Sequence, residues 1–414
     1  MVQQQHPPHR RYDIKKAVIP KALKEPITLG KSNLTSKNRF FKSPMSEYTA
    51  HFDPSDLKST GIPTKEIINA YEKWAYGGFG IMSTGAVILD QTGLNFLPGN
   101  MLIGEEEDSQ ERREGFEAIA KASKRFGSII LVQALNMEDQ MAFFKAQTDE
   151  EREKAMTKTR YATKYVYDRG FDGIILQILP AANEGKTDMD LTEKVVEEMA
   201  KLVRSTVPAT AKFVLGTKLS TAKFQQAGVD YEQFIHLLKV VEKCNYDFAE
   251  IAGGSIEFPL QKDESRECMY AHVIKSAKSK VPKLPLFATG GFRTVPAMEK
   301  SVASGELDGV GLARTAASEF DFPNKVIAHQ IQSAMWSPFE DDMSLGVPAA
   351  AAQIAQAGRT RLEETEFDAN YGIANFTNEE IKAAFLNAKK VRDAEIEELK
   401  KEGKLIGGVV QIDM

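Results

Sequence analysis

The chain has 414 residues, of which 42% are hydrophobic and 27% are charged, a composition that is ordinary for a globular protein. Its net charge of −5 gives no reason to expect nucleic acid or an anionic membrane as the main partner.

The N-terminus is polar, and no run of about 18 apolar residues occurs, so we expect neither a signal peptide nor a transmembrane helix. The two cysteines, Cys244 and Cys268, are too few for a disulfide framework or a cysteine metal site, and a cytoplasmic location is the default. The basic stretch from His9 to Lys24 is expected to be a solvated N-terminal arm, although a lipid-binding or targeting role is an alternative.

Eight apolar runs of strand length follow along the chain, and amphipathic segments separate most of them. Most of the runs are continuously apolar, which is typical of parallel strands buried on both faces. The predicted strands are Arg39–Pro44, Phe79–Val87, Ser128–Leu135, Gly173–Ile178, Phe213–Leu219, Asp247–Ala252, Leu284–Thr289 and Gly309–Ala313. The predicted helices are Thr64–Tyr76, Glu107–Phe126, Glu150–Arg169, Leu191–Val207, Tyr231–Cys244, Glu264–Ser279 and Val295–Ser304.

Eight strands that alternate with helices predict an α/β fold of the (β/α)8 TIM barrel class, in preference to a doubly wound sheet. We place an N-terminal arm at residues 1–35, the barrel at 36–340 and a C-terminal helical extension at 341–414. In the extension, Thr377 and Glu380 have the spacing of a capping box. The helix that follows is expected to pack on the barrel, and a homodimer contact is left open.

A phosphate site is predicted at the ends of the last two strands, where barrels commonly bind phosphate. Gly290 and Gly291 follow the seventh strand, and backbone N–H groups without a nearby Cβ can approach an anion closely. The eighth strand ends at Ala313 and Arg314, and the arginine offers a permanent positive charge. Either motif alone is also explained by a tight turn or a salt bridge.

Several stretches resemble the old yellow enzyme family of FMN-dependent NAD(P)H:flavin oxidoreductases. The resemblance covers residues 27 to 340 in order. It is carried by Asn38-Arg39-Phe40-Phe41-Lys42-Ser43-Pro44-Met45-Ser46-Glu47-Tyr48-Thr49-Ala50, by Tyr71-Glu72-Lys73-Trp74-Ala75-Tyr76-Gly77-Gly78-Phe79-Gly80 with Ser83-Thr84-Gly85, and by the two phosphate loops.

The resemblance implies that FMN binds in the barrel mouth and that NADH or NADPH is the reductant. Pro44, Met45 and Ser46 would line the isoalloxazine edge, and Gly85 would leave room for the ring. The resemblance also assigns six further cofactor positions around the ring and the phosphate. They are Gln133 and Lys218 at the flavin pyrimidine, where Lys218 would favour reduction, and the phosphate ligands Gly290, Gly291, Ala313 and Arg314. A capping glutamine and a salt-bridged lysine are the structural alternatives for Gln133 and Lys218.

The sequence departs from the family after the fourth strand. Family members place two hydrogen-bond donors and a proton-donating tyrosine there, and these positions fall on Gln177, Pro180 and Ala182. Gln177 keeps an amide donor, but the other two have no acid or side-chain donor. Beyond the first strand, Tyr48 is a candidate substrate contact.

The leading hypothesis is therefore an FMN-dependent oxidoreductase that passes hydride from NAD(P)H to a small organic acceptor, a quinone or an unsaturated carbonyl. Gln177, Tyr48 and Lys218 are the candidate catalytic residues, and no metal site is expected. An FMN-binding pseudoenzyme is the alternative, and a flavin-free barrel acting on a phosphorylated substrate is a third interpretation.

Overall fold

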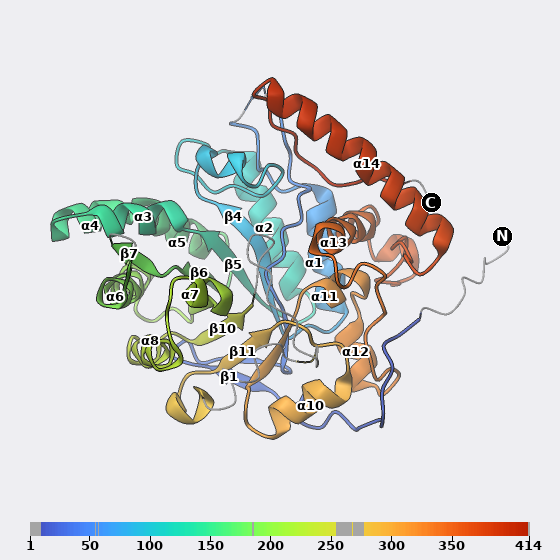
Figure 1. Cartoon of the computed structure of the whole chain (residues 1–414), viewed down its shortest axis with the longest axis horizontal. Helices are drawn as coiled ribbons and strands as arrows, with labels where there is room; N and C mark the ends of the chain where they lie inside the picture. Colours follow the sequence, from blue (N-terminus) through green and yellow to red (C-terminus); the bar gives the residue numbers. More distant parts are fainter. Residues whose placement is uncertain are drawn as a thin grey trace.

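The structure is a computed structural model that describes residues 10–412 apart from 54, 57, 184–185, 254–266 and 268–276. Eight parallel strands form a closed barrel, and helices surround it (Figure 1). The predicted (β/α)8 TIM barrel is confirmed. The neighbours around the ring are β3, β4, β5, β6, β9, β10, β11 and β12, and β12 pairs with β3 to close it.

Every predicted strand is present, with ends shifted by a few residues at most. The barrel strands are β3 (Phe40–Lys42), β4 (Ile81–Ile88), β5 (Ile129–Leu135), β6 (Gly173–Ile178), β9 (Val214–Ser220), β10 (Phe248–Ala252), β11 (Leu286–Thr289) and β12 (Gly309–Leu312). Continuous Val, Ile, Leu and Phe runs form these strands because branched and aromatic side chains suit a pleated surface that is covered on both faces.

The helices follow the predicted order, with one break. The outer layer includes α1 (Lys65–Tyr76), α2 (Gln110–Lys124), α6 (Met189–Thr206), α8 (Tyr231–Lys243), α10 (Val295–Ala303) and α13 (Met343–Gly358). The single helix predicted over Glu150–Arg169 is two helices, α4 (Asp149–Ala155) and α5 (Thr157–Asp168), because Met156 leaves helical geometry at φ −97° and ψ 18°. The helix predicted over Glu264–Ser279 lies mostly outside the described residues.

Shorter elements that the sequence did not predict lie mainly in the loops. They are the hairpin strands β1 (Ile27–Leu29) and β2 (Leu34–Ser36), the hairpin strands β7 (Ala181–Asn183) and β8 (Lys186–Asp188), the helices α3 (Met137–Lys145), α7 (Thr221–Gln226), α11 (Arg314–Ser318) and α12 (Phe322–Ile327), and the 3-10 turns η1 (Gln91–Asn95) and η2 (Glu363–Thr365).

The half of the barrel interior nearer the N-terminal ends of the strands is an apolar core. Phe41, Phe248 and Phe287 pack edge to face, with ring centroids 5.6–5.8 Å apart. Ile27 and Leu29 of the β1–β2 hairpin join the same cluster and close the barrel at its N-terminal end. In the described residues the N-terminal end of the barrel is thus filled by apolar side chains, and barrels of this class bind ligands at the C-terminal ends of their strands.

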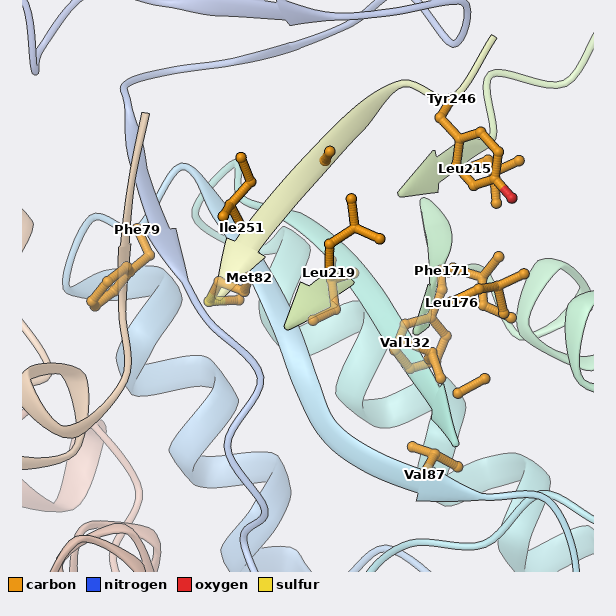
Figure 2. Packing of buried hydrophobic residues seen from close by; sticks show 14 of the residues in the cluster. Phe79, Met82, Val87, Val132, Phe171, Leu176, Leu215, Leu219, Tyr246 and Ile251 are labelled. Atoms are coloured by element: carbon orange, nitrogen blue, oxygen red, sulfur yellow. The ribbon is translucent and has the colours of Figure 1, made fainter. Parts of the chain in front are cut away.

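A second, larger core lies between the strands and the helices. Figure 2 shows side chains from successive strands in this layer, among them Met82, Val132, Leu176, Leu219 and Ile251. All of them are buried. This layer fixes the helices to the barrel and holds the strand ends in place.

The N-terminal arm is bound to the barrel, which corrects the expectation of a solvated arm. Arg11 forms two hydrogen bonds to the buried carboxylate of Glu319, at 2.6 and 2.8 Å. Arg10 stacks on the Trp336 ring at 4.2 Å, and the Tyr12 hydroxyl donates to Glu340 at 2.6 Å. The four lysines of the stretch remain exposed.

Helix α13 completes the outer layer by packing on α1. Lys73 donates to the Ala357 carbonyl at 2.7 Å, and Asn69 donates to the Gly358 carbonyl at 2.8 Å. A Cβ on Gly358 would lie 2.3 Å from the Glu66 carbonyl oxygen, so only glycine allows this approach. The division of the chain at residues 35 and 340 stays a prediction.

The last helix, α14 (Glu379–Lys401), begins one residue later than the predicted capping box requires. Asn378 is the N-cap, and its side chain accepts from the backbone N–H groups of Glu380 and Ile381. Phe385 packs against Phe339 and Phe376, but Val391 on the same helix is 70% exposed. In the part of the chain that is described, no helix combines the length and apolarity needed to cross a bilayer.

Candidate active site

A layer of polar side chains covers the apolar core at the mouth of the barrel. Gln177, Lys218 and Glu250 are register partners on β6, β9 and β10, and each lies two residues beyond an inward-facing position of the apolar core. Gln133 on β5 continues from the inward-facing Leu131 in the same way. The strands therefore bring together three residues that the sequence singled out, and they add Glu250.

The loop after β3 borders this layer. Pro44, Met45 and Ser46 are all partly exposed, and Gly85 of β4 lies directly beside them. A Cβ on Gly85 would lie 2.6 Å from the Met45 carbonyl oxygen and 2.6 Å from the Ser46 Cα. The absence of a side chain at Gly85 thus lets this loop pack against β4. That Gly85 also leaves space for a flavin ring stays a prediction.

Glu47 holds the loop from below. Its carboxylate is buried, accepts the Gly85 backbone N–H at 2.8 Å and also accepts the Tyr71 hydroxyl. Burial and the Glu47 charge raise the pKa of Tyr71 well above its usual value, so the phenol stays a donor. No role for Glu47 or Tyr71 was predicted from the sequence, although both lie in the stretches that carry the resemblance.

Lys42 supplies the charge that opposes Glu47. Its ammonium is buried 4.0 Å from the Glu47 carboxylate and donates to the Ser83 carbonyl at 2.9 Å. It also lies over the Trp74 ring, 4.4 Å from the centroid. Burial lowers the pKa of Lys42 to about 8, because the opposing effect of Glu47 is smaller than the loss of hydration.

Asn100 connects this loop to β4. Its amide donates to the Ser46 hydroxyl at 2.8 Å and to the Ala86 carbonyl at 2.7 Å. Its buried Oδ1 accepts no hydrogen bond from any described residue. The Ser46 hydroxyl, a predicted flavin contact, is therefore held in a fixed orientation.

Tyr48 lies in the loop after β3, next to Ser46 and Glu47. The ring packs against Ala351, Ala355 and Val409, and its backbone has a left-handed φ of 56°. Burial raises the pKa of its hydroxyl, which hydrogen-bonds to Ser46. Its role as a substrate contact stays a prediction, and its observed contact with the mouth runs through Ser46.

The loop between β4 and α2 is organised by one buried cation. Arg112 donates to four backbone carbonyls at 2.8–3.0 Å, those of Lys58, Thr60, Leu102 and Glu107. All four carbonyls belong to loops beside the mouth. The guanidinium suits this task because its five N–H groups point outward in one plane.

The loop after β11 already holds an anionic group. Gly290 and Gly291 have positive φ angles of 152° and 80°, and the Arg293 backbone N–H donates to the Glu267 carboxylate at 3.0 Å. The Thr294 backbone N–H hydrogen-bonds to the same carboxylate. The observed backbone donors to this anion are therefore those of Arg293 and Thr294, at the start of α10, and the roles of Gly290 and Gly291 as phosphate ligands stay predictions.

The arginines near this loop are engaged elsewhere. Arg293 forms two hydrogen bonds to Glu340, at 2.5 and 3.0 Å, and Arg314 lies 3.0 Å from the same carboxylate. Ala313 sits between β12 and α11 and is partly exposed. Among the predicted phosphate ligands, the charge of Arg314 is thus balanced by Glu340. The backbone N–H groups of the loop after β11 therefore remain the main candidates for binding a phosphate.

The end of β6 contains no acid. Pro180 is partly exposed and Ala182 is exposed. The buried Gln140 amide instead fixes the strand end, donating to the Gln177 carbonyl at 2.7 Å and accepting the Leu179 N–H at 3.0 Å. The described residues also contain no cluster of three or more His, Cys, Asp or Glu side chains that could hold a metal.

The acidic pair after β5 has structural partners. Asp139 is buried and accepts the Thr159 backbone N–H and hydroxyl, both at 2.7 Å. Glu138 lies 2.6 Å from the Lys158 ammonium. Both acids therefore hold α3 against α5.

Comparisons with known proteins agree with this geometry. No family model matches the chain. The chain is 26% identical over 396 residues to the NADH-dependent flavin oxidoreductase nadA of Aspergillus parasiticus, covering 83% of this chain and 87% of that protein. It is 27% identical over 385 residues to the NADH-dependent flavin oxidoreductase iliE of Hypocrea jecorina, covering 76% of this chain and 92% of that protein.

Solved structures with the same fold include the old yellow enzyme homologue of Zymomonas mobilis. It superposes with a TM-score of 0.58 at 17% identity, over 76% of this chain and 94% of that protein. A 2-naphthoyl-CoA reductase superposes with a TM-score of 0.65 at 17% identity, over 82% of this chain. The chain spans only 59% of the length of that reductase.

Proposed function

We infer that this member of the old yellow enzyme family is a flavin-dependent oxidoreductase that takes hydride from NADH. The curated relatives are named NADH-dependent flavin oxidoreductases, which favours NADH over NADPH. The observation that carries the proposal is the polar layer of Gln133, Gln177, Lys218 and Glu250 at the open end of the barrel.

The residues at the mouth fit FMN. The loop after β11 accommodates a carboxylate on backbone N–H groups, and a phosphate needs donors of the same kind. Bound FMN would supply reversible two-electron transfer between the nicotinamide and the acceptor. Gln133 and Lys218 would hold the flavin pyrimidine ring, and Pro44, Met45 and Ser46 would line the isoalloxazine edge. Gly290, Gly291, Ala313 and Arg314 would surround the phosphate.

Each polar residue has a distinct task in this proposal. Lys218 places a cation where reduction adds negative charge, and an oriented charge in a buried site stabilises that change strongly. The Gln133 amide both donates and accepts, which matches a pyrimidine ring. Gln177 offers one donor to the acceptor oxygen. Glu47 and Lys42 keep the loop that carries Ser46 in place.

We propose a quinone or an unsaturated carbonyl as the acceptor. Pro180 and Ala182 provide no proton donor at the end of β6. The acceptor would therefore take its proton from water, and this water could lie near the Gln177 amide. The partial loss of donors equally supports a second candidate, an FMN-binding pseudoenzyme with little or no turnover.

An anaerobic titration tests the proposal. Protein reconstituted with FMN is titrated with NADH while the visible spectrum is recorded. Bleaching of the flavin bands by about one equivalent of NADH per flavin is expected. Retained bands, with NADPH also inactive, would favour the pseudoenzyme. Turnover with a quinone well above a free-FMN control would exclude the pseudoenzyme, and absence of flavin binding would exclude both.

A further inference from the structure

Glu250 brings into the polar layer a buried carboxylate oxygen that has no hydrogen-bond partner among the described residues. The side chain is fully buried, and its Oε1 accepts the Thr289 hydroxyl at 2.7 Å. Its Oε2 accepts no hydrogen bond from any described residue. A buried carboxylate oxygen without a donor is costly, so its retention calls for a task at this site.

The hydrogen bond from Thr289 explains only one of the two carboxylate oxygens of Glu250. The Thr289 hydroxyl also lies 2.6 Å from the Ser43 hydroxyl, so Glu250, Thr289 and Ser43 form a chain across three strands. This chain uses Oε1 alone. A glutamine would accept from Thr289 equally well, and a negative charge is not needed for it.

Lys218 is a cation on the neighbouring strand beside Glu250. The two residues are register partners on β9 and β10, which are neighbouring strands about 4.8 Å apart. Both side chains project into the barrel mouth. Glu250 and Lys218 also shift the pKa of buried Lys42 in opposite directions, so their fields act on the same region.

We propose that Glu250 is a positioning residue that tunes the reduction potential of the flavin through its charge beside Lys218. The proposal rests on the proposed function, since it requires FMN in the mouth. Lys218 favours the reduced, more negative flavin, and Glu250 opposes that effect. The pair therefore holds the potential below the value that Lys218 alone would give, which favours hydride transfer to weakly oxidising acceptors such as unsaturated carbonyls.

The test replaces Glu250 by glutamine, which keeps the size of the side chain and the acceptor for Thr289. The midpoint potential of bound FMN is measured by anaerobic titration with a redox dye, and oxidised FMN binding is measured by fluorescence. In E250Q we expect reduced FMN to bind about tenfold more tightly relative to oxidised FMN. For a two-electron couple this is a rise of about 30 mV.

Three further variants make the result specific. Glu250→Asp keeps the charge and should stay near the wild-type potential. Glu250→Met, uncharged and of similar volume, should repeat the E250Q shift if the amide variant does not fold. Glu319→Gln removes a buried carboxylate that pairs with Arg11 and Lys325 outside the mouth, and it should leave the potential unchanged.

Each outcome bears on the proposal. A wild-type potential in E250Q and Glu250→Met, with FMN bound normally, would overturn the tuning role and leave the proposed function intact. A shift of equal size in Glu319→Gln would show that the effect is not local to Lys218, and it would also overturn the role. Wild-type protein that binds no FMN would overturn the proposed function itself.

Discussion

Gly85 donates its backbone N–H to the buried Glu47 carboxylate at 2.8 Å, and this bond joins β4 to the loop after β3. Gly85 on one side of this bond, and Met45 and Ser46 just before Glu47 on the other, border the proposed flavin edge. The bond therefore couples the shape of the mouth to a carboxylate that does not itself reach the mouth layer.

Replacing Glu47 by glutamine should weaken both the fold and the site. The buried Lys42 would lose its counter-charge, and breaking a buried pair from one side costs about 3–5 kcal/mol of unfolding free energy. Urea unfolding of the protein measures this loss. The exposed Glu150→Gln, which breaks only the Glu150–Lys154 surface pair, should cost less than about 1 kcal/mol. Equal losses in both variants would contradict a structural role for Glu47.

Replacing Gly85 by alanine should displace the loop at Met45 and Ser46. The new Cβ would lie 2.6 Å from backbone atoms of both residues, so the loop must move. We expect FMN affinity to fall at least tenfold, and fluorescence titration measures it. Gly127→Ala is the control, since its Cβ meets nothing within 4 Å and only its φ of 74° is strained. FMN affinity that survives Gly85→Ala would contradict the loop's part in the site.

The lowered pKa of the buried Lys42 ammonium predicts that the protein becomes more stable as the pH rises. Its folded pKa of about 8 is below the usual 10.5, so the unfolded chain binds the proton more tightly. The contribution of Lys42 to the free energy of unfolding is therefore least favourable below pH 8, and it improves as the pH rises from 8 toward 10.5. The full change is about 3 kcal/mol, since one pKa unit is about 1.4 kcal/mol.

Unfolding free energies at pH 7 and 9.5 test this sign. The wild-type protein should gain stability relative to Lys42→Met over this interval, because the variant lacks the titrating group. Lys65→Met, at an exposed position, should follow the wild type. A wild-type protein that loses stability relative to Lys42→Met would show that the sign is wrong.

Arg112 should be required for the loops beside the mouth. Replacement by alanine leaves four backbone carbonyls without their donor, and each buried unsatisfied group costs about 1–3 kcal/mol. We expect a loss of at least about 3 kcal/mol in urea unfolding. Lys at this position should recover only part of it, since an ammonium has three donors and no planar fork. Full recovery by Lys would contradict the geometric argument.

Lys218→Met should slow reduction of the flavin by NADH about tenfold or more and lower its potential, since the cation at the pyrimidine edge is lost. Stopped-flow absorbance measures the rate. Lys239→Met removes an exposed lysine on α8 and serves as the control. A wild-type rate in Lys218→Met would remove Lys218 from the catalytic residues.

Much of the fold was predictable because continuous apolar runs suit parallel strands covered on both faces. Gly290 and Gly291 were predictable for a related reason: only glycine readily adopts the φ angles that the structure shows there. The break at Met156 was not, because both flanking segments are good helix formers and the kink depends on how α4 and α5 pack.

The site was predictable only in part. Gln133, Gln177 and Lys218 end predicted strands, so their meeting at the mouth follows from the barrel. Glu47 and Glu250 were missed because neither an acid in a loop nor one within an apolar run reveals which residues it will contact in the fold. Their partners come from other strands and from α1, at sequence distances that no local pattern records.

The ring is closed by β12 pairing with β3, where Val310 lies opposite Phe40 and Leu312 opposite Lys42. This seam joins segments about 270 residues apart, and contacts of such separation form late because closing long loops is entropically costly. The loops after β3, β11 and β12 come together only when the seam has formed. A chain that is still open along this line has only half of the proposed cofactor site, so FMN uptake would report ring closure, and excess FMN should raise the stability of variants weakened at the seam.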